Sequence, residues 1–162
     1  MDWFNMSVKY HEQTFPHDAK LSSLPEEWQR ELAALWRLEA DVNNGGYLQF
    51  LENWGRDSYV YASQALKRIG AKKMAKLIDR CQALVDEHFN SEGKSPGASQ
   101  KLMPNTLIDA STGKVIESEG SVLPDSIVDR ILDLSYEFMD YPEDIEKLGL
   151  KYYKSLVEGD CG

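Results

Sequence analysis

Apolar residues recur every three or four positions along most of this chain, and this spacing limits the fold more than any other feature. The clearest case is residues 25–42, where one stripe holds Trp28, Leu32, Leu35 and Val42. Such a stripe is typical of an amphipathic α-helix that buries one face. The helix is expected to begin at Pro25, because proline is favoured in the first turn of a helix.

The same spacing predicts further helices over residues 47–54, 59–69, 74–89, 125–140 and 143–158. Gly70 is expected to end the third helix, because glycine is common directly after a helix. The sequence shows no internal repeat and no sign of a second domain. The sequence therefore predicts an all-α fold in which residues 1–162 form a single compact domain of about six helices.

Residues 91–123 have a different character, because glycine, proline, serine and threonine interrupt every apolar pattern. A long irregular loop is predicted here, between the fourth and fifth helices. Structureless loops of more than about 15 residues are uncommon in compact domains. A small hairpin is therefore predicted within the loop, with Leu107-Ile108 and Val115-Ile116 on either side of its turn.

The acidic residues are concentrated toward the end of the chain. The formal net charge is -9, and residues 109–162 alone hold 13 acidic against 5 basic side chains. Phosphate groups would be repelled by such a surface, which argues against direct binding to nucleic acid or to an anionic membrane. A basic protein is the more plausible partner. A basic cluster at Lys67, Arg68, Lys72, Lys73 and Lys76 is expected to balance nearby acids or to meet an acidic patch on another subunit.

The stretch "DVNNGGYLQFLENWG", residues 41–55, places two asparagines and two glycines between two helical patterns. A helix end with Asn44 or Gly45 in the left-handed conformation, or a positive φ at Gly45 or Gly46, would turn the chain here. Glu39 continues the apolar stripe of the preceding helix, and a buried carboxylate needs hydrogen-bond donors. We expect the free N–H groups of the next helix to supply them. The predicted structural polar cluster comprises Glu39, Asn43, Asn44, Gly45, Gly46, Gln49 and Asn53.

The same cluster admits a functional interpretation, in which it lines a small-molecule or catalytic pocket. The two interpretations predict different surroundings for Glu39. An enzyme or ligand-binding protein would place it in a concave, water-accessible pocket. A binding inhibitor would have a buried, capped Glu39 and a convex acidic face elsewhere.

The stretch "EADVNNGGYLQFLENWG", followed by "ASQALKRIGAKKMAKLIDRC", resembles a bacterial family of all-helical proteins long described as a domain of unknown function. The resemblance covers about residues 25–90. The best-known relative is described as a DNA-mimic protein, which is dimeric and occupies the DNA-binding face of a helix-turn-helix regulator. The resemblance implies an all-helical fold, a basic protein partner and a homodimer. It does not specify the surface acids on which mimicry depends.

An acidic ridge is predicted on the fifth helix. Its members recur every four residues or lie close to the same face: Asp125, Asp129, Asp133, Glu137 and Asp140. Neighbouring carboxylates are then about 6 Å apart along the helix axis, whereas one DNA strand carries a charge every ~3.4 Å. Acids of the following helix or a second subunit would have to add charge, and the nearest candidates are Glu143, Asp144 and Glu146. An ordinary solvated face, partly neutralised by Arg130, is the alternative.

Little in the sequence indicates metal or cofactor chemistry. The histidines of "HEQTFPH" lack the spacing of a zinc helix, and the loop "DASTGK" lacks that of a calcium or phosphate loop. We expect no metal, no cofactor and no enzymatic activity. The N-terminal residues show no export signal and the two cysteines no disulfide pattern, so a cytoplasmic location is expected.

The acidic composition predicts a protein-binding inhibitor of a basic protein, and the family resemblance implies that it acts on the DNA-binding face of that protein. The partner would be a helix-turn-helix transcription regulator or, for an immunity-type protein, a toxin or nuclease. The rival class is a small-ligand binder or an enzyme that uses the polar cluster around Glu39.

Overall fold

The computed structural model describes residues 1–14, 20–94, 102 and 105–160. Within these residues the chain forms six α-helices, one short 3-10 helix and one two-stranded hairpin. The helices are α1 (Trp3–Glu12), α2 (Glu27–Gly45), α3 (Tyr47–Ile69), α4 (Lys72–Ser91), α5 (Asp125–Met139) and α6 (Ile145–Asp160). The 3-10 helix is η1 (Leu21–Ser23), and the strands are β1 (Asn105–Ile108) and β2 (Val115–Glu119).

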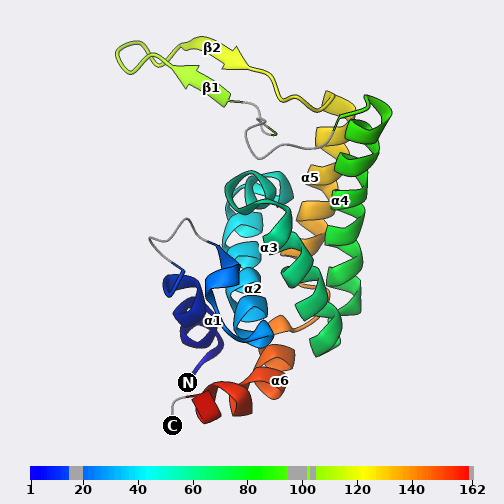
Figure 1. Ribbon diagram of the computed structural model, residues 1–162. Helices are drawn as coiled ribbons and strands as arrows, with labels where there is room; N and C mark the ends of the chain where they lie inside the picture. Colours follow the sequence, from blue (N-terminus) through cyan, green and yellow to red (C-terminus); the bar gives the residue numbers. More distant parts are fainter. Residues whose placement is uncertain (15–19, 95–101, 103–104, 161–162) are drawn as a thin grey trace.

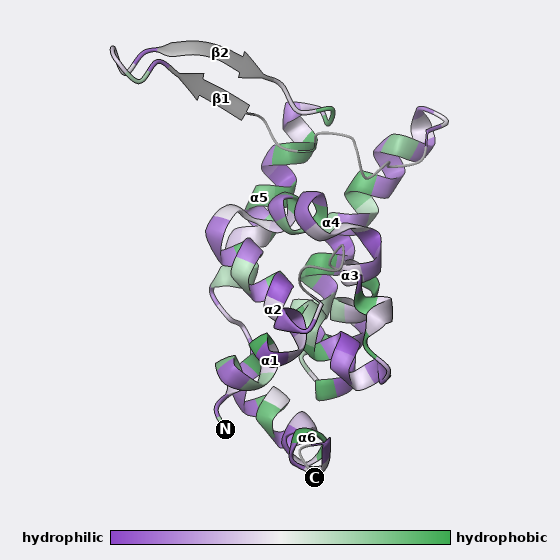
Figure 2. Cartoon of the chain, turned by 60° about the vertical axis from the view of Figure 1, so that its left-hand side comes forward, coloured by the Kyte–Doolittle hydropathy of each residue, from purple (hydrophilic) through white to green (hydrophobic). Residues whose placement is uncertain are grey.

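Helices α2 and α3 form the centre of the molecule (Figure 1). Helix α1 packs on α2, and α6 lies near α1 at the end of the molecule where both chain termini are found. Helices α4 and α5 run side by side in opposite directions and extend beyond the other helices. Figure 2 shows hydrophobic and hydrophilic residues alternating along the helices, as amphipathic helices require.

The predicted all-α class with six helices is confirmed, although one helix was not predicted. Residues 47–69 carry one label, α3, but Gly55 inside this element is not helical, with φ 76° and ψ -174°. Two helical segments therefore meet at a kink there, in agreement with the two helices expected over residues 47–54 and 59–69. Helix α1 is absent from the prediction. Its buried face includes the polar residues Ser7 and His11 beside Trp3, Met6 and Tyr10, so its apolar stripe is incomplete.

The corner between α2 and α3 is tighter than the sequence suggests. Helix α2 continues through Asn44 and Gly45, so neither has the left-handed conformation considered for it. The turn is made by Gly46 alone, with φ 88° and ψ -179°, and the prediction of a positive φ at this glycine pair is confirmed. The Gly46 N–H donates to the carbonyl of Val42, and α3 begins at the next residue.

The predicted hairpin is present between α4 and α5. Strands β1 and β2 are antiparallel, with Ile108 opposite Val115 and an irregularity between Leu107 and Ile108. The Asp109 carboxylate accepts from the N–H groups of Ser111 and Thr112, which stabilises the turn. The hairpin lies beyond the paired ends of α4 and α5 (Figure 1).

Apolar side chains from all six helices form one continuous core. Its largest fully buried side chains include Tyr10, Tyr47, Phe50 and Tyr153, together with the charged side chain of Arg37. None of the helices among the described residues is long and apolar enough to cross a membrane.

Candidate functional site

Glu39 is held by side chains, and not by the N–H groups of α3 as the sequence suggested. Its Oε2 accepts from the indole Nε1 of Trp3 at 2.7 Å, and its Oε1 accepts from the hydroxyl of Tyr141 at 3.1 Å. The Asn43 amide donates to the carbonyl oxygen of Glu39 and to the Tyr141 hydroxyl. The prediction failed because Gly46 turns α3 away and the Tyr47 N–H donates to Ser135 of α5 instead.

Asp41, which no sequence pattern singled out, is the acceptor for the polar side chains at the corner. Its carboxylate accepts from the side-chain amides of Gln49 and Asn53, both at 3.1 Å. It also accepts from the indole Nε1 of Trp54 at 2.6 Å. Gln49 and Asn53 therefore donate to Asp41 and not to Glu39. Two separate polar clusters replace the single cluster that was predicted, one around Glu39 and one around Asp41.

Glu39 lines a hollow of about 280 Å³ between α1 and α2. Three aromatic side chains share this hollow, namely Trp3, Phe4 and Trp36, and its remaining lining comes from Ser7, Ala40 and Asn43. Glu39 is half-buried, and burial raises the pKa of its carboxyl above the ordinary value. Glu39 therefore combines features of both interpretations, since its oxygens are hydrogen-bonded and its side chain also faces a pocket.

The five residues of the acidic ridge are all exposed. Asp125, Asp129, Asp133 and Glu137 lie along α5, and Asp140 follows its last turn. Among the described residues, none of these five carboxylates has a lysine or arginine partner within ion-pair distance. The expected neutralisation by Arg130 is therefore not made as a direct ion pair.

Two of the three acids proposed to extend the ridge stabilise helix ends. The Glu143 carboxylate accepts from the N–H groups of Lys73 and Met74 at 2.9 and 3.0 Å, which caps the first turn of α4. The Asp144 carboxylate accepts from the Lys147 N–H at 2.9 Å at the start of α6. Glu146 is exposed. The loop between α5 and α6 therefore contributes less free charge than the sequence suggested.

The ridge borders a groove of mixed charge between α4 and α5. Two hollows of about 400 and 450 Å³ follow this groove, and both are lined by Arg80 and Glu137. Basic residues from α4 and α5 line one or both hollows: Lys73, Lys76, Arg80 and Arg130. The convex acidic face expected of an inhibitor is therefore hollowed beside Asp133, Glu137 and Asp140, whereas Asp125 and Asp129 line neither hollow.

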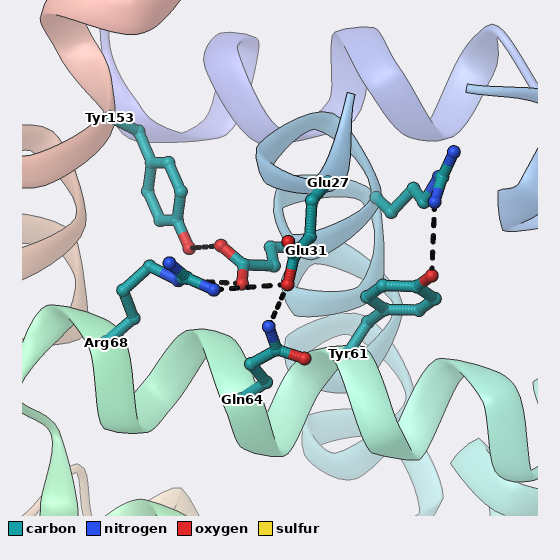
Figure 3. Close-up of polar contacts among 7 residues, drawn as sticks. Glu27, Glu31, Tyr61, Gln64, Arg68 and Tyr153 are labelled. Carbon is teal, nitrogen blue, oxygen red and sulfur yellow. Dashed lines mark hydrogen bonds and ion pairs between the residues drawn. The ribbon is translucent and has the colours of Figure 1, made fainter. Parts of the chain in front are cut away.

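Part of the predicted basic cluster is used in internal ion pairs. Lys67 pairs with Asp79 at 2.7 Å. Arg68 pairs with the buried Glu31 at 2.8 Å, and Glu31 also accepts from the Tyr153 hydroxyl (Figure 3). Burial raises the pKa of Glu31. Glu31, Arg68 and Tyr153 together link α2, α3 and α6. The ion pairs of Lys67 and Arg68 support the interpretation that the basic residues balance nearby acids.

A second buried polar cluster surrounds Arg37 of α2. Its guanidinium donates to Nδ1 of His11 at 3.2 Å, to Ser58 at 2.9 Å and to Thr14 at 2.8 Å. The guanidinium also lies over the ring of Trp54, 4.3 Å from its centroid. Burial, followed by the charge of Arg37, lowers the pKa of His11 to about 4. Arg37 and His11 were not predicted as functional residues. The hydrogen bonds of Arg37 connect α2 to His11 of α1 and to Ser58 of α3.

No group of three or more histidine, cysteine, aspartate or glutamate side chains within the described ranges is arranged to hold a metal ion. Cys81 is buried, and its burial raises the pKa of the thiol to about 12. Its thiol is therefore poorly placed for nucleophilic chemistry.

Comparison with known proteins identifies the family. A family model described as DMP19-like protein matches residues 22–157. Neither the curated proteins nor the solved structures that were compared gave a match. The matched residues extend from η1 to α6, and they include the corner, the ridge and the groove beside it. The chain therefore belongs to the DMP19-like family, which is the DNA-mimic-protein-like family that its corner motif resembles.

Proposed function

We propose that this protein is a non-catalytic inhibitor that binds the DNA-binding face of a basic protein, such as a helix-turn-helix transcription regulator. The observation that carries the proposal is the exposed acidic ridge on α5, whose carboxylates have no ion-pair partner among the described residues. Membership of the DMP19-like family supports a DNA mimic in general terms. The partner and the inhibitory role are our inference.

The charge spacing on α5 supports a contact with groups that bind phosphates. Carboxylates at every fourth residue follow one another at about 6 Å, close to twice the ~3.4 Å axial spacing of charges on a DNA strand. Like charges at this helical spacing cost some tenths of a kcal/mol per pair. The ridge therefore opposes folding slightly, which favours a role outside the molecule.

The groove indicates which part of the ridge would form the centre of the contact. Near Asp133 and Glu137 the field of the acids is reduced by Arg80 and Arg130. Asp125 and Asp129 lie outside the groove, at the end of α5 nearest the hairpin. A basic partner should therefore contact the first half of α5 most strongly, with Asp133 at the edge of the contact.

One experiment tests both the class of partner and the mimicry. Tagged protein is used to capture partners from the source cells at low salt, and each captured protein is then purified and titrated. A phosphate-binding partner should lose affinity steeply as salt rises, and duplex DNA should compete for the same site. A captured partner whose binding is unaffected by duplex DNA would contradict the proposal.

The competition experiment also separates the two kinds of basic partner. A transcription regulator should be displaced by its own operator sequence much better than by random duplex, whereas a nuclease should show little sequence preference.

A further inference from the structure

The hollow between α1 and α2 has aromatic walls and one carboxylate. Trp3 and Phe4 come from α1, and Trp36 comes from α2. Phe4 is 63% exposed, the largest exposed fraction among the large hydrophobic side chains that the structure describes. Phe4 therefore presents an exposed ring to a group that comes from outside. Trp3 is 7% exposed and Trp36 is stacked on His11, so these two rings line the hollow mainly as its apolar wall.

Glu39 is fixed in position at this hollow. Each carboxylate oxygen accepts one hydrogen bond, from Trp3 or from Tyr141, so each retains acceptor capacity for a ligand. Tyr141 has a φ of 47°, an uncommon conformation for a bulky residue, and its hydroxyl donates to Glu39. The carboxylate is thus held by contacts from α1 and from the loop after α5.

The charge of Glu39 is not balanced by a cation of the described chain. No described lysine or arginine lies within ion-pair distance of it. Burial raises the pKa of Glu39, and the negative charge of Glu146 adds to this effect. A cation in the hollow would compensate both effects. Aromatic faces beside a carboxylate are the surroundings that bind organic cations through cation–π and charge interactions.

We propose that this hollow binds an arginine side chain of a basic polypeptide. A guanidinium group stacks on aromatic rings and can donate to both oxygens of one carboxylate, while its aliphatic stem packs on apolar walls. The chain itself provides each half of this arrangement, since Arg37 lies over Trp54 and Arg68 donates to Glu31. The assignment of this arginine to the DNA-binding partner rests on the proposed function. The ability of the hollow to bind an arginine side chain does not depend on that function.

The test uses the full chain and short peptides. Acetyl-Gly-Arg-Gly-amide is titrated into ¹⁵N-labelled protein, and the indole N–H signals of the four tryptophans are followed. The signals of Trp3 and Trp36, which line the hollow, should shift and saturate. Those of Trp28 and Trp54 should stay in place, because neither residue lines it. The same peptide with norleucine in place of arginine should produce no saturable shift.

Three variants establish the site. Phe4→Ala removes an exposed ring, so the fold should be unchanged and the dissociation constant of the arginine peptide should rise about fivefold. Glu39→Gln removes the negative charge and should weaken binding by about tenfold or more. Asp57→Asn makes the same change in net charge at an exposed residue of α3 and should leave binding unchanged.

The outcomes distinguish this inference from the proposed function. Saturable shifts that Phe4→Ala and Glu39→Gln weaken, and that persist when Asp129 and Asp133 are changed to lysine, support the arginine site whatever the ridge does. Absence of saturable shifts, equal shifts with the norleucine peptide, or equal binding by Glu39→Gln would overturn the arginine site. None of these three results would bear on the ridge.

Discussion

At the scale of single residues, the buried polar groups fix how the helices meet. His11 accepts from Arg37 through Nδ1 and stacks on Trp36, with 4.0 Å between the ring centroids. Only the neutral imidazole can accept that hydrogen bond. The charged groups that act on His11 are Arg37, which opposes its protonation, and Asp41, which favours it. Burial decides the balance in favour of the neutral form.

His11 should therefore make the stability depend on pH. Its pKa in the folded protein, about 4, is below the ordinary value of 6.5, so the unfolded chain takes up the proton first as the pH falls. Its contribution is complete above pH 6.5 and is lost as the pH falls from 6.5 toward 4. Urea unfolding at pH 7, 6 and 5 measures this loss. In His11→Asn, which keeps a side-chain acceptor and does not titrate, the loss over this range should be smaller; an equal loss would exclude His11 as its source.

Gly46 is the second residue whose conformation decides the fold. A φ of 88° with ψ near 180° is a region that essentially only glycine adopts, and an added Cβ would lie 3.2 Å from the hydroxyl of Ser135. Gly46→Ala should lower the free energy of unfolding by about 1–3 kcal/mol. Gly159→Ala, in α6 with open space around it, should leave stability unchanged or raise it slightly. Chemical denaturation of both variants checks this, and equal stability of the two would contradict the account of the corner.

The sequence predicts some of these residues and not others, for a physical reason. The positive φ at the glycine pair follows from local chemistry, because the chain must turn within two residues of α2. The partners of Glu39 and Asp41 come from α1, α3 and the loop after α5, and spacing along one helix carries no information about them. Arg37 was missed because its acceptors His11, Thr14 and Ser58 come from other parts of the chain.

At the scale of the helices, periodic apolar stripes were a good guide to α2, α4, α5 and α6. They failed for α1, whose inner face includes buried Ser7 and His11. The break expected between residues 54 and 59 is present, since Gly55 inside α3 is not helical. The spacing of the acidic residues was enough to predict the ridge. It could not predict that basic residues of α4 lie beside the ridge, because the packing of α4 against α5 is a tertiary feature.

Because α4 packs beside α5, removing a basic side chain of α4 should raise the affinity for a basic partner. Arg80 lines both hollows beside Glu137 and reduces the negative field that a basic partner would meet. Arg80→Gln should therefore tighten binding of the captured partner by about two- to fivefold, in line with the small energies of exposed charges. Lys151→Gln on α6 makes the same change in net charge and should have a smaller effect. Calorimetric titration measures both, and weaker binding by Arg80→Gln would show that the partner contacts this arginine directly.

At the scale of the whole molecule, one ridge carries about half of the charge density of a DNA strand. Glu143 and Asp144 are occupied as helix caps, so the nearby loop adds little free charge. A second subunit related by a two-fold axis would double the number of ridges, and two-fold dimers are the commonest oligomers. We therefore propose that the protein acts as a homodimer.

Light scattering coupled to size-exclusion chromatography tests the dimer directly. At tens of micromolar the mass should be close to twice the 18.4 kDa of the chain. The mass should also fall on dilution if the dimer is weak, because subunit association depends on concentration. A mass of one chain at every concentration would mean that the contact with the partner relies on a single ridge.

The central claim is that the carboxylates of α5 take the place of DNA phosphates, and one affinity measurement tests it most directly. The captured partner is titrated with the wild-type chain, with Asp129→Lys/Asp133→Lys, and with the control Glu12→Lys/Asp57→Lys. Both double variants change the formal net charge from -9 to -5, since each reversal adds two charges, and all four residues are exposed. Stability should change by only about 0.5 kcal/mol per residue. We predict that the ridge variant loses binding while the control keeps most of it; equal affinity of the two variants would show that the ridge is an ordinary solvated surface.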